Sequence, residues 1–268
     1  MAALRFAAAG TLTVLAMSLG GAASARSSSL PPFPRISPSC TRADFRSQGR
    51  TVRAALCLPS ASQAAPAVVV LHGCGGFGTL DQVLARDLPT HGIATYYVDY
   101  FGLTPAPSRK GFCNAHGRVA NAFETWQRIV VDAATAVRRQ TGVDPTRVGA
   151  VGWSLGAGLA LVTAEYGGRP VGSVPQRSRP FRALALFSTA AFEPILAHVG
   201  RLPPTLVLDG GSGDVIPPAD ATALYRALRH AHVPASLFVY PHGNHQWKGA
   251  QGAAGERRAV TFLKRYLG

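Results

Sequence analysis

A serine between two glycines is the first group in this sequence that could do covalent chemistry. Ser154 lies in the run Gly152-Trp153-Ser154-Leu155-Gly156, which has the pattern G-x-S-x-G. The residues at 147–151 are mostly apolar and too few for a helix, whereas those at 157–162 are rich in Ala and Leu at helical spacing. A strand, a tight turn and a helix in this order hold such a serine exposed as a nucleophile. An ordinary turn of small residues has the same pattern by chance, and the flanking elements favour the nucleophile.

An acid and a base must accompany the serine, because a lone hydroxyl is a weak nucleophile. In this setting the acid comes next in the chain and the histidine last, each on a loop after a later strand. Asp214 lies in a glycine-rich loop after a strand that we expect to end at Leu208, and Asp209 at the strand end is the alternative. The loop position favours Asp214. His242 and His245 both follow the last expected strand, and their spacing alone does not separate them.

Backbone amides must also be in place to bind the oxyanion that forms when a carbonyl is attacked. The amide of Leu155, at the start of the helix, is one expected donor. The other should come from the loop Gly73-Cys74-Gly75-Gly76, where small residues let the main chain approach closely. We therefore expect the amide of Cys74 to be the second donor.

The elements that would position these groups alternate along the chain from about residue 66. Expected strands are 51–58, 67–71, 93–98, 147–151, 182–187, 203–208 and 235–240, and expected helices include 79–91, 119–141, 218–231 and 252–267. Such alternation predicts the α/β class, a mostly parallel sheet with helices on both faces. No glycine-rich nucleotide-binding motif follows a strand, so no nucleotide cofactor is expected.

The first residues have the pattern of a secretory signal peptide. Arg5 is followed by an uncharged, mostly apolar run at 6–19, and Ala23-Ser24-Ala25 has the form of a cleavage site. The run is short for a helix that spans a membrane. We expect residues 1–25 to be removed and the protein to be secreted or periplasmic, with no membrane span remaining.

After the cleavage site, we expect residues 26–50 to form a lead-in segment rich in Ser and Pro. Residues 51–268 are expected to form a single α/β domain. The formal charge of the whole chain is +14. Such a charge favours anionic surfaces or substrates. The arginines are scattered without an aromatic-interleaved basic motif, so no nucleic-acid partner is expected.

All four cysteines follow the expected cleavage site, which suggests two disulfides in an oxidising compartment. No C-x₂-C pair is present, which argues against zinc. We expect Cys40 to pair with Cys57 across the turn-rich segment between them. Cys74 and Cys113 lie in loops after neighbouring strands, at the same edge of the sheet, and we expect them to form the second bridge.

Four motifs together resemble the dienelactone hydrolase family of α/β-hydrolases over residues 52–267. They are Val69-Val70-Leu71-His72-Gly73-Cys74-Gly75-Gly76, Gly152-Trp153-Ser154-Leu155-Gly156, Gly213-Asp214-Val215-Ile216-Pro217-Pro218 and Tyr240-Pro241-His242-Gly243-Asn244-His245-Gln246-Trp247. The resemblance implies Asp214 as the acid and His245, rather than His242, as the base. The enzymes that name the family carry cysteine in place of Ser154, so the serine favours an esterase.

Together with the signal-peptide pattern, this resemblance predicts an exported serine hydrolase that cleaves small-molecule carboxylic esters or lactones without a metal or organic cofactor. We expect it to be a monomer. The Gly-Trp-Ser sequence also resembles exported cutinase-like polyester hydrolases. A peptidase of the prolyl oligopeptidase type is a further alternative, although no accessory propeller domain is present. A non-catalytic binding protein on the same fold would have no need of all three triad residue types.

Overall fold

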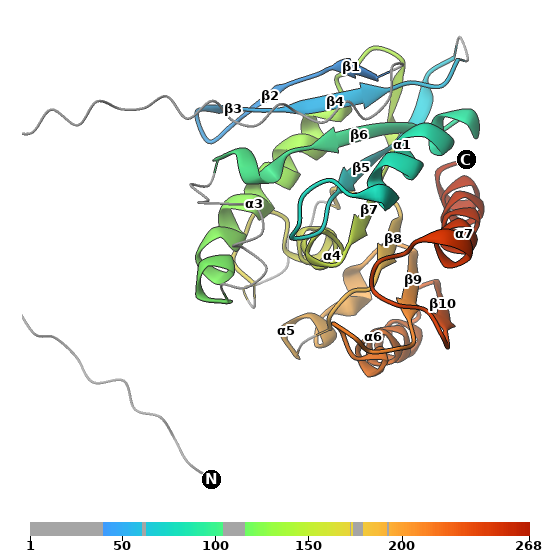
Figure 1. Ribbon diagram of the computed structural model, residues 1–268. Coiled ribbons are helices and arrows are strands. Elements are labelled where there is room, and N and C mark those ends of the chain that lie inside the picture. Colours follow the sequence, from blue (N-terminus) through green and yellow to red (C-terminus); the bar gives the residue numbers. More distant parts are fainter. Residues whose placement is uncertain (1–39, 61–62, 104–115, 172, 174–178, 192) are drawn as a thin grey trace, which may run out of the picture. The chain divides into compact units, whose positions relative to one another are not determined.

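The computed structural model describes residues 40–60, 63–103, 116–171, 173, 179–191 and 193–268 (Figure 1). The strands are β1 (Cys40–Arg42), β2 (Phe45–Ser47), β3 (Arg50–Val52), β4 (Ala54–Cys57), β5 (Ala65–Leu71), β6 (Ala94–Val98), β7 (Val143–Trp153), β8 (Leu184–Phe187), β9 (Thr205–Gly210) and β10 (Ala235–Tyr240). The helices are α1 (Thr79–Thr90), α3 (His116–Val137), α4 (Leu155–Tyr166), α5 (Glu193–Leu196), α6 (Pro218–His230) and α7 (Gly249–Leu267), with 3₁₀ turns η1 (Tyr100–Leu103) and η2 (Val199–Arg201).

Within these residues the main sheet has eight strands in the order β1-β4-β6-β5-β7-β8-β9-β10. Six neighbouring strands, β6, β5, β7, β8, β9 and β10, run parallel to one another. At one edge, β4 pairs antiparallel with β6, and β1 pairs antiparallel with β4. Every residue of β5 is buried, as expected for a central strand of a parallel sheet covered on both faces. The predicted α/β class is therefore correct.

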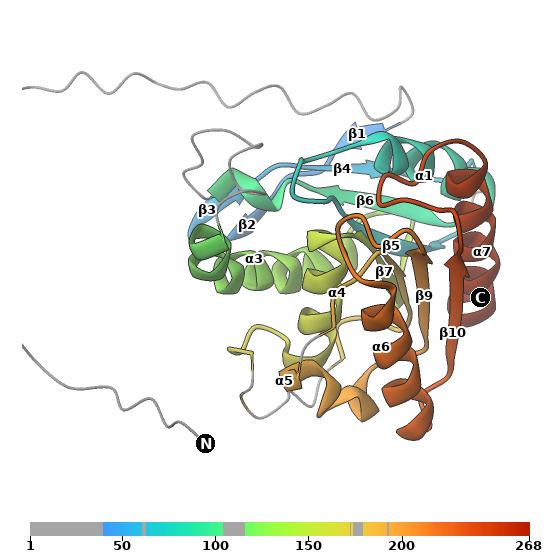
Figure 2. The same cartoon turned by 60° about the horizontal axis from the view of Figure 1, so that its bottom comes forward.

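Helices cover both faces of the sheet, as the two views show (Figures 1 and 2). Apolar residues of α3, α4 and α6 pack in one core cluster with one face of the strands. Those of α1 and α7 pack in a second cluster with the opposite face. The apolar stripe that helical periodicity predicts for each of these segments thus faces one of the two core clusters.

The order of the central strands creates a topological switch point where the candidate site should lie. After β5 the chain passes through α1 to β6 on one side, and then returns through α3 to β7 on the other side of β5. Loops after β5 and β7 therefore leave the sheet at a topological switch point, where ligands bind in open α/β sheets. Cys74 follows β5 and Ser154 follows β7.

The N-terminal strands differ from the sequence-based expectation. Strands begin at Cys40, inside the segment expected to be a lead-in, and the predicted strand 51–58 is divided at Arg53 into β3 and β4. β3 pairs with β2, whereas β4 pairs with β1 and β6, so the two halves belong to different sheets. Three-residue strands are too short for a clear alternation of apolar and polar residues, which is why the pattern did not reveal them.

Of the two predicted disulfides, the structure describes one in full. Cys40 lies opposite Cys57 in the β1–β4 pair and the two form a disulfide, as predicted. Cys74 is also in a disulfide. Its expected partner, Cys113, and the expected signal peptide, residues 1–25, lie outside the described residues, so both stay predictions. No helix among the described residues is long and apolar enough to cross a bilayer.

Candidate active site

Ser154 lies in a tight turn between β7 and α4. Its backbone has φ +55° and ψ −119°, a conformation that residues other than glycine rarely adopt. The amide of Ser154 donates to the carbonyl of Phe187 on β8 at 2.8 Å, and its own carbonyl accepts from the amide of Ala157 at 2.9 Å. Hydrogen bonds on both sides thus hold the strained residue in place, at the carboxyl end of the sheet.

The glycines of G-x-S-x-G are required by close contacts of the backbone. A Cβ atom on Gly152 would lie 2.4 Å from the carbonyl oxygen of Gly156. A Cβ on Gly156 would lie 2.1 Å from the carbonyl oxygen of Leu71 and 2.5 Å from that of His72. Only glycine allows the start of α4 to sit this close to the end of β5, and this contact brings Ser154 beside the loop after β5.

The loop after β5 is a turn closed by the amide of Gly76, which donates to the carbonyl of Gly73 at 3.0 Å. The Tyr100 hydroxyl donates to the carbonyl of His72 at 2.6 Å, and the two rings stack with centroids 4.2 Å apart. These contacts fix the path of the main chain into Cys74. Leu155 opens α4, so its amide has no acceptor inside the helix and lies at the positive end of the helix dipole.

His245 is held beside Trp153 and Asp214 by its main chain. The amide of His245 donates to both carboxylate oxygens of Asp214, at 3.1 and 3.3 Å. The carbonyl of His245 accepts from the indole Nε1 of Trp153 at 2.9 Å. Trp153 directly precedes Ser154, so the structure brings the loops of all three predicted triad residues to one place.

The imidazole of His245 is buried, with 7% of the residue exposed. Burial lowers the pKa of this imidazole below its ordinary value of 6.5, and the charge of Asp214 opposes that shift in part. Its ring forms no hydrogen bond with Ser154 or Asp214 in the described part of the structure. Such bonds are often long without a bound substrate. A neutral imidazole near neutral pH is the form that accepts a proton.

Burial separates the candidates that the sequence left open. Asp209 lies inside β9, not after it, and burial raises the pKa of its carboxyl to about 6. Asp214 is exposed and accepts a hydrogen bond from the hydroxyl of Ser212 at 2.8 Å. His242 is exposed, in contrast to His245. Among these four candidates, Asp214 and His245 are joined by a hydrogen bond from the His245 amide to the Asp214 carboxylate.

Ser188 and Trp247 anchor the histidine loop, and the role of Ser188 was not anticipated. The indole of Trp247 donates to the hydroxyl of Ser188 at 2.8 Å and packs edge-on against Phe187 and Tyr240. Both Ser188 and Trp247 have positive φ, +49° each. No local motif marks Ser188, because its partner is 59 residues away in the chain.

Within the described residues no group of three or more His, Cys, Asp or Glu side chains is placed to hold a metal ion. Cys74, Ser154, Asp214 and His245 lie on the loops that follow β5, β7, β9 and β10, and Leu155 is the first residue of α4. The chemistry that this arrangement can perform is attack by Ser154 on an electrophile between α4 and the loop after β5.

Comparison with known sequences points to one family. The sequence profile of the dienelactone hydrolase family matches residues 52–261. An uncharacterized protein of Mycobacterium tuberculosis (strain ATCC 25618 / H37Rv) is 29% identical over an alignment of 196 residues, which covers 67% of this chain and 63% of that protein. This chain therefore covers less than two thirds of that relative's length.

Solved structures agree in fold. Dienelactone hydrolase from Anabaena variabilis has a TM-score of 0.65 and 18% identity, covering 86% of this chain and 100% of that one. An esterase of the Planctomycetes species Thermogutta terrifontis, solved with propionate bound, has a TM-score of 0.66 and 16% identity, covering 87% of this chain and 95% of that one. At these identities the likeness shows the α/β-hydrolase fold.

Proposed function

Because the chain belongs to the dienelactone hydrolase family, we propose that this hydrolase is a serine enzyme that cleaves small-molecule carboxylic esters or lactones. The observation that carries the proposal is the turn at Ser154. Its φ of +55° between β7 and α4 is the strained conformation of a nucleophile on this fold. The loop of His245, bonded to Asp214 and Trp153, lies next to it.

In the proposed mechanism, the hydroxyl oxygen of Ser154 attacks the ester carbonyl while Nε2 of His245 takes its proton. The amides of Leu155 and Cys74 stabilise the resulting oxyanion. His245 then gives the proton to the leaving alcohol, and Asp214 favours the imidazolium and holds the ring orientation. A water molecule, deprotonated by His245, attacks the acyl-enzyme; the bond to the Ser154 oxygen breaks, His245 returns the proton to that oxygen, and the carboxylic acid is released.

The same proposal includes export from the cytoplasm. The Cys40–Cys57 disulfide supports it, because such bonds persist in oxidising compartments. The signal-peptide pattern of residues 1–25 supports it independently. Extraction of the mature protein and sequencing of its N-terminus would test it, and an intact Met1 in the exported fraction would contradict cleavage.

A fluorophosphonate probe followed by a panel of p-nitrophenyl esters tests the reaction class. We expect one labelled peptide that contains Ser154, and turnover of esters in the panel. Labelling with turnover of peptides but not of esters would favour the peptidase alternative. An unlabelled protein without turnover would favour a binding protein on the same fold.

Replacement of Asp214 by asparagine should lower kcat by about 10³- to 10⁴-fold, because an amide does not stabilise the imidazolium and favours the wrong tautomer. The matched control is Asp209→Asn, which removes a carboxylate from the neighbouring strand. Since Asp209 is buried in β9, whereas Asp214 is the carboxylate that accepts from the amide of His245, replacement of Asp209 should leave kcat nearly unchanged. Steady-state kinetics on one ester decide, and the reverse ranking would assign the acid role to Asp209.

The pH profile should report His245. The base works only when neutral, so kcat/KM should fall as the pH falls through the pKa of the imidazole, with a midpoint below 6.5 because burial lowers that pKa. In Asp214→Asn the residual activity should have its midpoint at still lower pH, because the carboxylate no longer favours the imidazolium. Asp209 also has a pKa of about 6, so Asp209→Asn is the control. A midpoint that moves in this control instead would show that Asp209 is the titrating group.

A further inference from the structure

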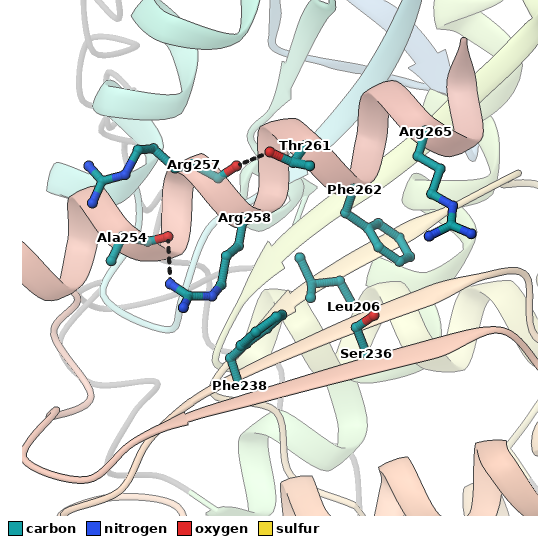
Figure 3. A pocket seen from close by; sticks show the side chains of 9 residues that line it. All are labelled: Leu206, Ser236, Phe238, Ala254, Arg257, Arg258, Thr261, Phe262 and Arg265. Carbon is teal, nitrogen blue, oxygen red and sulfur yellow. Dashed lines mark hydrogen bonds between the residues drawn. The ribbon is translucent and has the colours of Figure 1, made fainter.

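A groove lies between α7 and the edge strand β10, on the far side of β9 from β7 (Figure 3). Its volume is about 280 Å³. The lining residues are Leu206, Ser236, Phe238, Ala254, Arg257, Arg258, Thr261, Phe262 and Arg265. None of the catalytic candidates is among them, so this groove is separate from the proposed active site.

The floor of the groove is apolar. Phe238 is 39% exposed and is one of few large hydrophobic side chains among the described residues that are so open to solvent. Leu206 on β9 and Phe262 on α7 lie beside it and are buried. An exposed ring beside buried aliphatic and aromatic groups favours a ligand with an apolar body.

The walls of the groove are cationic. Arg258 and Arg265 are seven residues apart, which is about two helical turns, and so project from the same side of α7. Figure 3 shows both side chains reaching from α7 toward β10, one on each side of Phe262, whereas Arg257 points away from Phe238. No acidic residue lines the groove.

Arg258 is fixed in a position where it can meet an anion. Its guanidinium lies over the ring of Phe238, 4.3 Å from the centroid, and donates to the hydroxyl of Tyr240 at 2.8 Å. Neither Arg258 nor Arg265 forms an ion pair with a carboxylate in the described part of the chain. Glu256, the nearest acid in sequence, instead lines a separate cavity between α1 and α7.

The cationic wall continues beyond Arg265. A second cavity of about 450 Å³ shares Ser236 and Arg265 with the first, and its lining adds Arg229 and His232 without an acid. A second copy of this chain is a poor occupant, because pairing of two β10 edges would bring the arginines of both copies together.

We propose that the groove between α7 and β10 binds amphipathic organic carboxylates. The apolar body lies over Phe238, Leu206 and Phe262, and the carboxylate accepts hydrogen bonds from Arg258 or Arg265. Arginine suits this role because its planar fork matches a carboxylate in two parallel bonds. The assignment does not rest on the proposed catalytic function, since no atom of the candidate active site takes part.

Calorimetric titration of the whole protein with octanoate at low ionic strength tests the proposal. Acetate supplies the charge without the apolar body, and 1-octanol supplies the body without the charge. We expect octanoate to bind more tightly than either, and binding to weaken as salt is added. Equal affinity for acetate and octanoate, or for octanol and octanoate, would overturn the proposal.

Variants place the binding in the groove. At least one of the variants Arg258→Gln and Arg265→Gln should weaken octanoate binding about tenfold, as expected for the loss of a charge-assisted hydrogen bond. Arg139→Gln, an exposed arginine just after α3, makes the same charge change elsewhere and should leave the affinity unchanged. Equal weakening in all three variants would mean a general charge effect and would overturn the proposal. Unchanged affinity in Arg265→Gln and Arg258→Gln would place octanoate elsewhere, with the candidate active site as one such place.

Folding controls keep the result interpretable. Within the described part of the chain, the guanidinium of Arg265 lies over the ring of Tyr266 alone, 5.4 Å from its centroid, so Arg265→Gln should not disturb the fold. Its unfolding temperature is measured beside that of the unmodified protein. Binding of a single-stranded oligonucleotide more tightly than octanoate, lost in the same variants, would also overturn the proposal in favour of a polyanion.

Discussion

Replacement of Ser154 by alanine should lower kcat for ester hydrolysis by about four orders of magnitude or more, with little change in the unfolding temperature. The catalytic loss follows because no other hydroxyl sits in the turn at the start of α4. The stability should change little because alanine keeps the Cβ atom, and the strain at φ +55° is the same for both residues. Steady-state kinetics and thermal unfolding measure the two effects.

Ser60→Ala is the matched control, since Ser60 is an exposed serine remote from α4 in the chain. It should retain full activity and full labelling by fluorophosphonate. Hydrolysis that persists in Ser154→Ala would contradict the proposed mechanism. A large fall in unfolding temperature in Ser154→Ala would instead mean that the hydroxyl stabilises the fold.

Replacement of Gly156 by alanine should destabilise the protein by about 3 kcal/mol or more, because the new Cβ would lie 2.1 Å from a main-chain oxygen. Neither Leu71 nor His72 can yield by rotating a side chain, since the contacts are to their carbonyl oxygens. The end of β5 or the start of α4 must therefore move. We expect a lower unfolding temperature together with a lower kcat, because the amides of Cys74 and Leu155 lie on the two parts that separate.

Gly158→Ala provides the comparison within the same helix. A Cβ atom on Gly158 would meet nothing within 4 Å. Alanine in the middle of a helix is about 0.5–1 kcal/mol more favourable than glycine, so this variant should be slightly more stable and equally active. If Gly156→Ala unfolds at the same temperature as Gly158→Ala, then the close approach of α4 to β5 does not constrain the site.

The sequence could predict the features that depend on residues close together in the chain. The turn at Ser154 and the order of strands and helices are of this kind, because apolar periodicity and small residues encode them locally. The Cys40–Cys57 disulfide was also predictable, since the two cysteines are 17 residues apart and the turn-rich segment after Cys40 lets the chain return. The position after a strand favoured Asp214 over Asp209, whereas only the family resemblance selected His245 over His242, and both roles stay predictions.

The contacts that join the loops could not be predicted, because each depends on the folded register. Trp153 meets the carbonyl of His245 across 92 residues, and the His245 amide meets Asp214 across 31 residues. Nothing in the local sequence around Ser188 indicated that it would hold Trp247. The division of the first predicted strand into β3 and β4 was missed because such short strands show no clear alternation and because each half pairs with a different strand.

The hydrogen bond from Trp153 to the histidine loop has a consequence for protein engineering. The loop after β10 cannot be exchanged as an independent module, since its position is set in part by a side chain from β7. Trp153 also touches Gly73, where a Cβ atom would lie 2.8 Å from its ring, so one indole spans the loops after β5 and β10. A grafted loop with its own histidine would therefore be held in the same position only if the recipient protein has a tryptophan at position 153 and a glycine at position 73.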